Sequence, residues 1–284
     1  MRQLLKLSIV ILIFTIQCRA QTFLPRKYPL DGNALEILQG FNGTLGTGPN
    51  TPISTSDRFG NGNGAMFFDG NDFISIPTTN LLSPTYTYAA WVTISQLPVN
   101  EEFSILAVGD NIGDQFLGCA QNQFGNGFTG SMYYAPFPGY LQVYDGLLPN
   151  YNTWYRLIFT YGVDQMALWV NGIKIDSANT LGQVPFYGNQ PYAAIGARNF
   201  PFINAYNWHG KIDELEYLPF AINDSIITGE RASLQLAPML SVSNHEIRLA
   251  YFGNDINLQL YDLSGRKLLI GERNKLDLSS LSSG

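Results

Sequence analysis

The sequence predicts an all-β protein with an antiparallel β-sandwich as its main domain and a small β-sandwich-like domain as its tail. Three features of the 284-residue chain indicate this: aromatic residues and glycines are abundant, charges are few, and the apolar runs are short and separated by turn dipeptides. Charged residues make up only 13% of the chain, against roughly 25% in an average globular protein. Aromatic residues favour strands, and glycine and asparagine favour tight turns.

Short apolar or alternating segments are the expected strands of the sandwich. Asn-Gly and Asp-Gly pairs lie between many of them and tolerate the positive φ angles of tight hairpins. The clearest hairpin covers residues 166–176 and turns at Asn171-Gly172. The expected strands are residues 65–69, 73–76, 86–94, 103–109, 140–144, 154–161, 166–170 and 211–217. Many short strands with regular turns are typical of sandwiches.

The N-terminal residues have the pattern of an export signal. A basic start precedes an apolar run from Leu7 to Cys18, and small Ala20 follows. The run is shorter than a membrane-spanning helix needs, so we expect a cleaved signal peptide over residues 1–20. Lipid attachment at Cys18 is the alternative. No later stretch is long and apolar enough for a membrane span, so the expected location is extracellular or on the outer cell surface.

Charge and cysteine content exclude some functions. The net charge of −6 becomes more negative when the basic signal peptide is removed. Nucleic acid is therefore not an expected partner, because phosphate binding needs clustered Lys and Arg. Cys119 is the one cysteine outside the signal peptide. It forms no internal disulfide, and we expect it to be a buried, small apolar residue.

Phosphate-binding and zinc motifs are not supported. Gly60, Gly62 and Gly64 have the spacing G-x-G-x-G, but no Lys-Ser/Thr pair and no βαβ pattern follow. They are expected in turns. His209 and His245 lie in different predicted domains, and no H-E-x-x-H sequence is present. The sequence therefore predicts no catalytic residues.

A calcium site is one interpretation of an early loop. Asp31 and Asn33 are two short oxygen-bearing side chains on either side of Gly32. Calcium takes six to eight oxygen ligands, and Asp213 on a distant expected strand would supply more. The predicted site for a structural Ca²⁺ ion is therefore Asp31, Asn33 and Asp213. The alternative is that these are ordinary turn-forming residues.

A cluster of aromatic residues predicts a sugar platform. Tyr133, Tyr134, Phe137 and Tyr140 lie close together among prolines and glycine. Aromatic rings in such a loop are poor core material, so we expect them to be exposed and able to stack on the apolar face of a pyranose. The alternative is ordinary packing of strand aromatics.

The ordered set of these segments resembles the laminin-G-like, concanavalin-A-like jelly-roll domains of secreted bacterial proteins. The matching segments are residues 28–34, 42–45, 57–61, 68–76, 90–92, 154–161, 168–172 and 210–215. The resemblance implies a jelly roll over residues 25–232 and a structural calcium where the first and last strands meet. It implicates Asp31, Asn33 and Asp213, although Glu36 stands where the family often has Asp.

The same resemblance brings a hydrolase alternative, because β-glucanases share this fold. Those enzymes carry E-x-D-x-x-E on one strand, with alternate carboxylates facing the cleft. Here Glu214 and Glu216 alternate in this way, but the intervening Asp and the third acid are absent. We therefore expect a non-enzymatic protein, with the carboxylates as solvated charges on a strand face.

The tail, residues 236–284, resembles the C-terminal sorting domain of the type IX secretion system of the Bacteroidetes group. Composition shifts near residue 230, and leucine and serine then dominate. Residues 258–267 match the strand-turn-strand signature of that domain, and residues 276–284 match the stretch before its final strands. We expect the sequence to be truncated before those strands.

Together these features predict a secreted or cell-surface binding module that recognises carbohydrate and is exported by the type IX machinery. Its expected partners are a glycan or a surface protein, and that secretion machinery. The alternatives are a surface adhesion protein that binds proteins, and an unusual glycoside hydrolase on the same fold. Fold alone does not decide among them.

Overall fold

A computed structural model of the chain describes most of the predicted jelly roll and the backbone of five strands in the tail. The described residues are 23–110, 113–134, 139–189, 191–198 and 206–222, with residues 239–243, 246–250, 258–261, 267–271 and 275–277. The predicted signal peptide and Phe137 lie outside them. The described ranges contain strands and one short 3-10 turn, η1 (Gly48–Asn50), but no α-helix.

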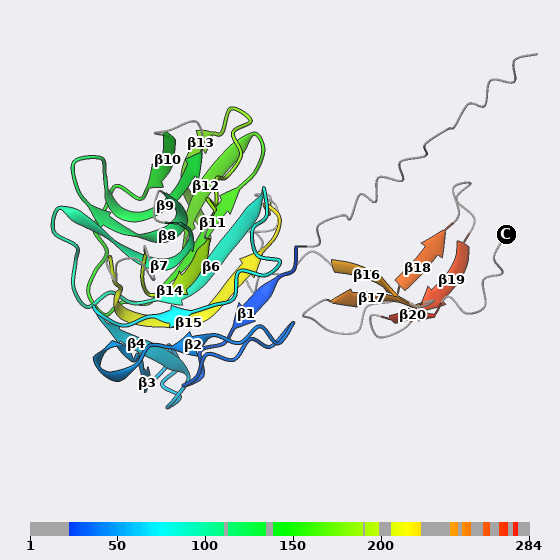
Figure 1. The fold of residues 1–284 in the computed structure, drawn as a ribbon, viewed down its shortest axis with the longest axis horizontal. Coiled ribbons are helices and arrows are strands. Elements are labelled where there is room, and N and C mark those ends of the chain that lie inside the picture. The colour runs from blue at the N-terminus through cyan, green and yellow to red at the C-terminus, as the bar shows by residue number, and fades with distance from the viewer. Residues whose placement is uncertain are drawn as a thin grey trace, which may run out of the picture.

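The first sheet, sheet A, has eight strands (Figure 1). Seven follow the order β13-β12-β11-β6-β15-β4-β3, and β1 pairs with β15. Their bounds are β1 Arg26–Tyr28, β3 Ile53–Thr55, β4 Ala65–Asp69, β6 Tyr86–Val92, β11 Tyr155–Tyr161, β12 Gln165–Val170, β13 Ile173–Asn179 and β15 His209–Leu218.

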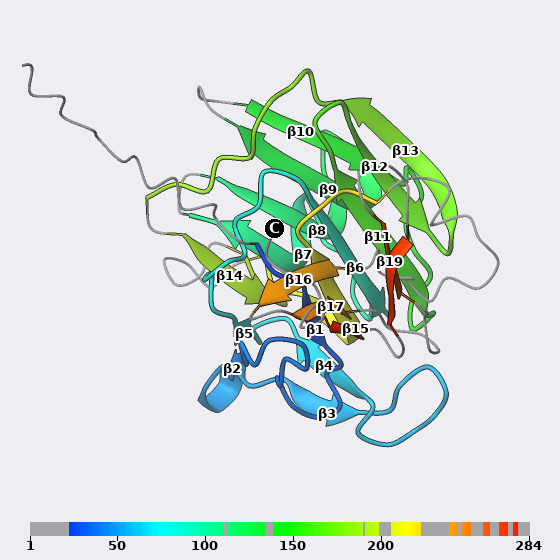
Figure 2. The same ribbon diagram turned by 90° about the vertical axis from the view of Figure 1, so that its right-hand side faces the viewer.

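The second sheet, sheet B, has seven strands in the order β10-β9-β8-β7-β14-β5-β2 (Figures 1 and 2). Their bounds are β2 Thr44–Leu45, β5 Ile74–Ser75, β7 Glu101–Gly109, β8 Asp114–Gln121, β9 Asn126–Tyr134, β10 Gly139–Tyr144 and β14 Tyr192–Ile195. Neighbouring strands in both sheets are antiparallel. The predicted antiparallel sandwich of jelly-roll type is therefore confirmed.

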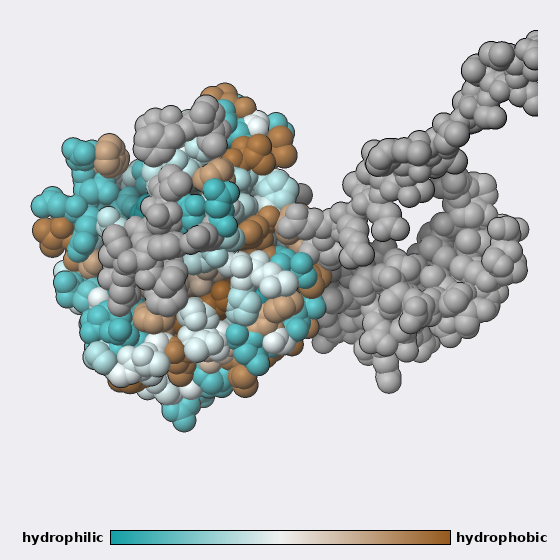
Figure 3. Space-filling view, in the orientation of Figure 1, coloured by the Kyte–Doolittle hydropathy of each residue, from teal (hydrophilic) through white to brown (hydrophobic). Residues whose placement is uncertain are grey.

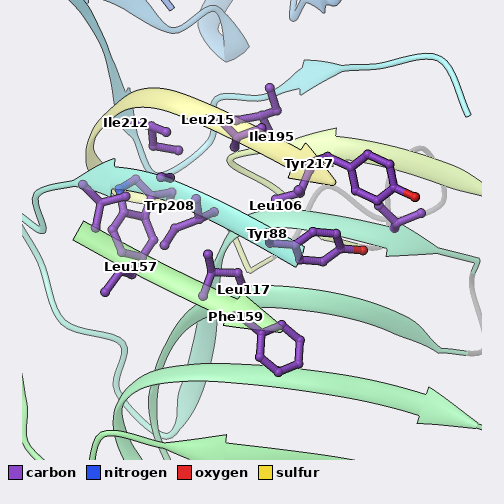
Figure 4. Packing of buried hydrophobic residues seen from close by; sticks show 14 of the residues in the cluster. Tyr88, Leu106, Leu117, Leu157, Phe159, Ile195, Trp208, Ile212, Leu215 and Tyr217 are labelled. Carbon is purple, nitrogen blue, oxygen red and sulfur yellow. The ribbon is translucent and has the colours of Figure 1, made fainter. Parts of the chain in front are cut away.

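The hydrophobic core lies between the two sheets. Figure 4 shows side chains of β6, β11 and β15 from sheet A packed with those of β7, β8 and β14 from sheet B. Trp208, which precedes β15, is fully buried among them. The other labelled core residues are Tyr88, Leu106, Leu117, Leu157, Phe159, Ile195, Ile212, Leu215 and Tyr217. Burial of this apolar surface is the main favourable term in folding.

Every segment expected to be a strand contains one, and the predicted hairpin is present. β12 and β13 meet at Val170 and Ile173, and the turn between them is Asn171-Gly172. Both turn residues have positive φ, 52° and 80°. This is the backbone conformation that Asn-Gly pairs adopt at low cost in two-residue hairpins. Cys119 is buried, as expected.

Besides the two-residue β2, the sheet B strands absent from the expected set are β8, β9 and β14, and these three are buried strands. Nearly all their residues are buried, so the alternation of apolar and polar residues that marks a half-exposed strand is missing. Gly118 in β8 also interrupts the apolar pattern. It is required there, because a Cβ atom would lie 2.0 Å from the carbonyl oxygen of Phe103.

The outer face of sheet B, away from the core, carries a small apolar cluster of its own. Ala107, Phe116, Tyr192 and Ala194 form it, and they alternate along their strands with residues of the main core. The strand register extends this face across the sheet from β8 to β10, because Phe116 pairs with Ser131, and Ser131 pairs with Gln142. The outer face of sheet B is therefore partly apolar near β14 and polar near β10.

The tail contains the short strands that its sequence predicts. They form one three-stranded sheet, β16-β17-β20, and one two-stranded sheet, β18-β19. Their bounds are β16 Met239–Ser243, β17 Glu246–Ala250, β18 Leu258–Tyr261, β19 Lys267–Gly271 and β20 Lys275–Asp277. The assignment of this region to a sorting domain stays a prediction.

The surface of the jelly roll mixes residue types. On the face shown in Figure 3, hydrophobic side chains are scattered among hydrophilic ones. Scattered exposed apolar residues are normal on a folded protein. Within the described ranges, the structure contains no helix with the length and hydrophobicity of a membrane span.

Candidate functional site

A polar groove of about 1030 Å³ opens on the outer face of sheet B. Its walls combine amide side chains, two carboxylates, one guanidinium and three aromatic rings. The lining residues are Asn100, Glu101, Glu102, Asn122, Gln123, Phe124, Tyr140, Gln142, Arg198 and Tyr206. A concave site with a few convergent polar groups and aromatic rings is the usual form of a small-molecule site.

Two strands and one turn present most of these groups. β7 begins with Glu101 and Glu102, and β10 contributes Tyr140 and Gln142. The turn between β8 and β9 is shaped by Asn122, whose Oδ1 accepts hydrogen bonds from the backbone N–H of Phe124 at 2.9 Å and of Gly125 at 3.2 Å. Such side-chain-to-backbone bonds are why Asn favours turns. The turn leaves the Phe124 ring exposed.

Arg198, which follows β14, is the centre of the groove. Its Nε lies 2.7 Å from Oδ1 and 2.9 Å from Oδ2 of Asp114. Its Nη1 lies 2.5 Å from Oε2 of Glu102. The guanidinium carbon is 4.2 Å from the centre of the Phe116 ring and 5.2 Å from that of Tyr206. The arginine is thus fixed by two ion pairs and by cation–π contacts.

The electrostatics of this centre follow from burial. Burial raises the pKa of Asp114, and the charge of Arg198 and a hydrogen bond from the Tyr192 hydroxyl oppose that rise. Burial by itself would lower the pKa of Arg198, but Asp114 and Glu102 outweigh it and raise that pKa above its ordinary range. Arg198 therefore stays charged at every physiological pH.

Further hydrogen bonds fix the orientation of Glu102. Its Oε1 accepts from Asn122 Nδ2 at 3.2 Å and from Gln142 Nε2 at 3.1 Å. The amide oxygen of Gln142 in turn accepts from the Tyr144 hydroxyl at 2.6 Å. We call this connected set the Arg198 network: Glu102, Asp114, Asn122, Gln142, Tyr144, Tyr192 and Arg198. Its members hold one another in place before any ligand arrives, which favours binding.

Three aromatic rings at the groove are accessible to solvent. Phe124 is 72% exposed, Tyr140 40% and Tyr206 36%. A large apolar ring left this exposed beside a polar groove is available to stack against a ligand. The groove therefore offers both polar contacts and ring faces.

The predicted aromatic platform is divided by the structure. Tyr140 lines the groove. Tyr133, its partner across β9 and β10, is only 2% exposed and packs against the Tyr140 ring, with 4.9 Å between centroids. Tyr134, the next residue along β9, packs against the main core. The expectation that these tyrosines are exposed loop residues is therefore wrong for Tyr133, because both strands extend into this segment.

Sequence reasoning missed most of the groove. Arg198 and Glu102 are 96 residues apart in the chain, and neither belongs to a local motif. One signal was available for Arg198: it is a lone charge just after a buried apolar strand, in a chain with few charges. Burial of such a charge requires partners. The sequence does not indicate which residues those partners are.

A second ionic cluster lies on sheet A, at β15, which runs between β6 on one side and β4 and β1 on the other. Nη1 of Arg58 is 2.8 Å from Oδ2 of Asp213, and its Nη2 is 3.1 Å from Oε1 of Glu214. Consecutive residues of a regular strand point to opposite faces. Here a bulge follows Asp213, and Glu214 has a positive φ of 46°. The bulge lets one guanidinium reach both carboxylates.

The bulge has a topological cause. Before it, residues 209–212 of β15 pair with β4. After it, residues 215–217 pair with β1 on the same edge. The strand changes neighbours at Asp213 and Glu214, and β-bulges often occur where pairing is interrupted in this way.

The structure places the three predicted calcium ligands in different roles. Asp31 is close enough to Asp213 to raise its pKa. Asn33 forms a local turn: its Nδ2 donates to the Asp31 carbonyl at 2.8 Å, and its Oδ1 accepts from the Leu35 N–H at 2.9 Å. Asp213 pairs with Arg58. Among the described residues, no group of three or more Asp, Glu, His or Cys side chains is placed to hold a metal ion. The calcium site stays a prediction.

Glu36 organises the neighbouring loop without a metal. Its carboxylate accepts four backbone N–H bonds, from Lys27 at 3.0 Å, Leu38 at 2.9 Å, Gln39 at 2.6 Å and Phe41 at 3.3 Å. A buried carboxylate is stable when its oxygens are paired in this way. The residue that departs from the family pattern thus closes the loop by hydrogen bonding.

The two carboxylates of the hydrolase alternative are held by different cations. Glu214 pairs with Arg58 and is partly exposed. Glu216 is buried, 2.9 Å from the Lys27 ammonium and 3.2 Å from Nη2 of Arg156. The bulge between Asp213 and Glu216 breaks the alternation that the sequence suggested.

The fold is a two-sheet β-sandwich with a polar groove on the outer face of sheet B. The family model described as the concanavalin A-like lectin/glucanases superfamily matches residues 68–228, more than half of the chain. The protein belongs to this superfamily. No curated protein matches the sequence significantly.

Two solved structures share the fold. One is domain 4 of AbnA, a GH43 extracellular arabinanase from Geobacillus stearothermophilus, solved in complex with arabinotriose. It has a TM-score of 0.57 and 18% identity, over 74% of this chain and 98% of that chain. The other is the binding domain of botulinum neurotoxin serotype G, with a TM-score of 0.51 and 14% identity, over 72% of this chain and 49% of that chain. At these identities the likeness concerns the fold.

The Arg58 cluster predicts a pH-dependent stability. Burial, then the charge of Glu214, raises the pKa of Asp213 to about 7, and Arg58 opposes the rise. Since this folded-state pKa lies above the ordinary value, the stability that Asp213 contributes is present below about pH 4 and lost as the pH rises through about 7. Replacing Arg58 with Met should therefore destabilise the protein by about 3 kcal/mol at pH 8, and far less at pH 5.

Urea denaturation at the two pH values measures this difference. Arg58→Lys keeps the positive charge without the forked geometry of the guanidinium. At pH 8 it should therefore lower the free energy of unfolding by less than Arg58→Met does. If Arg58→Met lowered the free energy of unfolding equally at pH 5 and pH 8, the assigned ion pairs would be contradicted.

Proposed function

We propose that the protein is a secreted or cell-surface module that recognises carbohydrate, and that the saccharide binds in the groove on the outer face of sheet B. The observation that carries the proposal is the combination found there. Exposed rings of Phe124, Tyr140 and Tyr206 flank polar groups that hydrogen bonds already hold in place. Sugars present apolar ring faces and polar hydroxyls, which match these two kinds of surface.

The likeness to the arabinanase domain supports this proposal. That domain was solved with arabinotriose bound, and the match covers nearly all of its length. The shared fold makes a saccharide a reasonable first ligand to test, while the argument for binding rests on the groove of this chain.

Export by the type IX secretion system is part of the proposal. It rests on the resemblance of residues 236–284 to the sorting domain and on the export-signal pattern of residues 1–20. The tail strands β16–β20 are the short strands that such a domain would contain. The jelly roll would then bind the saccharide, and the tail would direct export.

Calcium remains a proposal for the edge formed by Asp31, Asn33 and Asp213. Binding would require Asp213 to leave Arg58 and Asn33 to turn away from its own backbone. A bound ion would stabilise the folded state by mass action. If calcium binds, melting in 5 mM CaCl₂ should occur above melting in EDTA by about 4 °C or more, and Asp31→Ala should abolish the difference. Equal melting temperatures would contradict the calcium proposal.

Truncation of the exposed rings tests the groove. Phe124→Ala and Tyr140→Ala should each weaken binding of a saccharide by about tenfold, because an aromatic contact at the centre of an interface is costly to lose. Isothermal titration calorimetry with the oligosaccharides that bind in a glycan array, arabinotriose among those tested, measures the change.

Tyr151→Ala is the matched control, because Tyr151 is 55% exposed and does not line the groove. Its affinity should equal that of the unmodified protein. Unchanged affinity in both groove variants would place the site elsewhere. A folded protein that binds no glycan on the array would contradict carbohydrate recognition and favour a protein partner.

A further inference from the structure

The groove has an excess of negative charge. Among the described residues, Glu101 and Glu102 line it together with one cation, Arg198. Asp114 lies directly beneath and also pairs with Arg198. Even without Asp114, carboxylates outnumber the guanidinium. A carboxylated ligand would therefore enter a site whose net charge repels it.

Two of the three guanidinium nitrogens of Arg198 already contact protein carboxylates. Its Nε contacts both oxygens of Asp114 and its Nη1 contacts Glu102. A ligand carboxylate that took the place of Glu102 would leave that side chain, only 13% exposed, without its cation. Leaving a buried charge without its partner has a large cost in free energy.

The hydrogen-bonding groups of the groove point to the same class of ligand. Asn122 and Gln142 each donate one amide N–H bond to Glu102. The carboxylates of Glu101 and Glu102 only accept hydrogen bonds. A sugar hydroxyl can donate to them, whereas an ionised carboxylate has no proton to donate.

From these contacts we propose that the groove selects uncharged saccharides and rejects those with carboxylate groups, such as uronates and sialic acids. This inference rests on the proposed function, because it specifies the ligand of the same groove. Glu101 is the residue whose charge is easiest to reverse: it is exposed at the start of β7, and its side chain is not part of the Arg198 network.

The test compares acidic saccharides with their own uncharged methyl esters. The acidic probes are uronate and sialylated oligosaccharides, each used as the free acid and as its methyl ester, and arabinotriose is the neutral reference. Binding to the protein is measured by calorimetry at low salt, where charge repulsion is screened least. We expect arabinotriose or the esters to bind, and each free acid to bind roughly tenfold more weakly than its ester.

Two charge-reversal variants assign the cause. Glu101→Lys should raise the affinity for the free acids. The ratio of the affinity for each ester to the affinity for its free acid should therefore fall by roughly tenfold. Asp164→Lys changes the net charge equally at an exposed turn outside the groove, and it should leave the ratio unchanged.

The possible failures are distinguishable. Free acids that bind the unmodified protein as tightly as their esters would overturn this inference alone. An unchanged ratio in Glu101→Lys would also overturn it, because the selectivity would not come from charge in the groove. A protein that binds none of these probes and nothing on the glycan array would overturn the proposed function, and this inference with it.

Discussion

The need to neutralise one buried cation organises the outer face of sheet B. The side chain of Arg198 is only 11% exposed, and a charge in such a place is tolerated only when matched. Asp114 on β8 and Glu102 on β7 match it, so both strands and the segment after β14 meet at this point. The contacts that stabilise the buried charge of Arg198 thus also hold in place the polar groups that shape the groove.

Buried charges are also matched on sheet A, but there, among the described residues, they form no groove. Arg58 is matched by Asp213 and Glu214, and Glu216 by Lys27 and Arg156. These charges close a strand bulge and tie β1 to β15, and none of them lines the groove. A matched buried charge is therefore no sign of a binding site by itself. Arg58 also lies over aromatic rings, those of Phe59 and Trp91, so the open groove beside Arg198 is the feature on which the assignment of the site rests.

The sequence predicted the fold better than the site, for physical reasons. The Asn171-Gly172 turn and the half-exposed strands follow from local preferences. Strands β8 and β9 are buried on both faces and lose their alternation. Tyr133 and Tyr134 are neighbours in the chain, yet only the cross-strand register shows that Tyr133 lies beside Tyr140 and packs against its ring. Arg198 finds its partners through contacts across 84 and 96 residues, which no local pattern specifies.

The most direct test of whether a saccharide binds in the groove is hydrogen–deuterium exchange with and without a saturating neutral oligosaccharide. This measurement locates the ligand without any substitution. The account predicts that added protection is confined to the groove segments, residues 100–102, 122–124 and 140–142. Protection that appears instead around Arg58 and Asp213, with none in the groove, would contradict the assignment of the site to the outer face of sheet B.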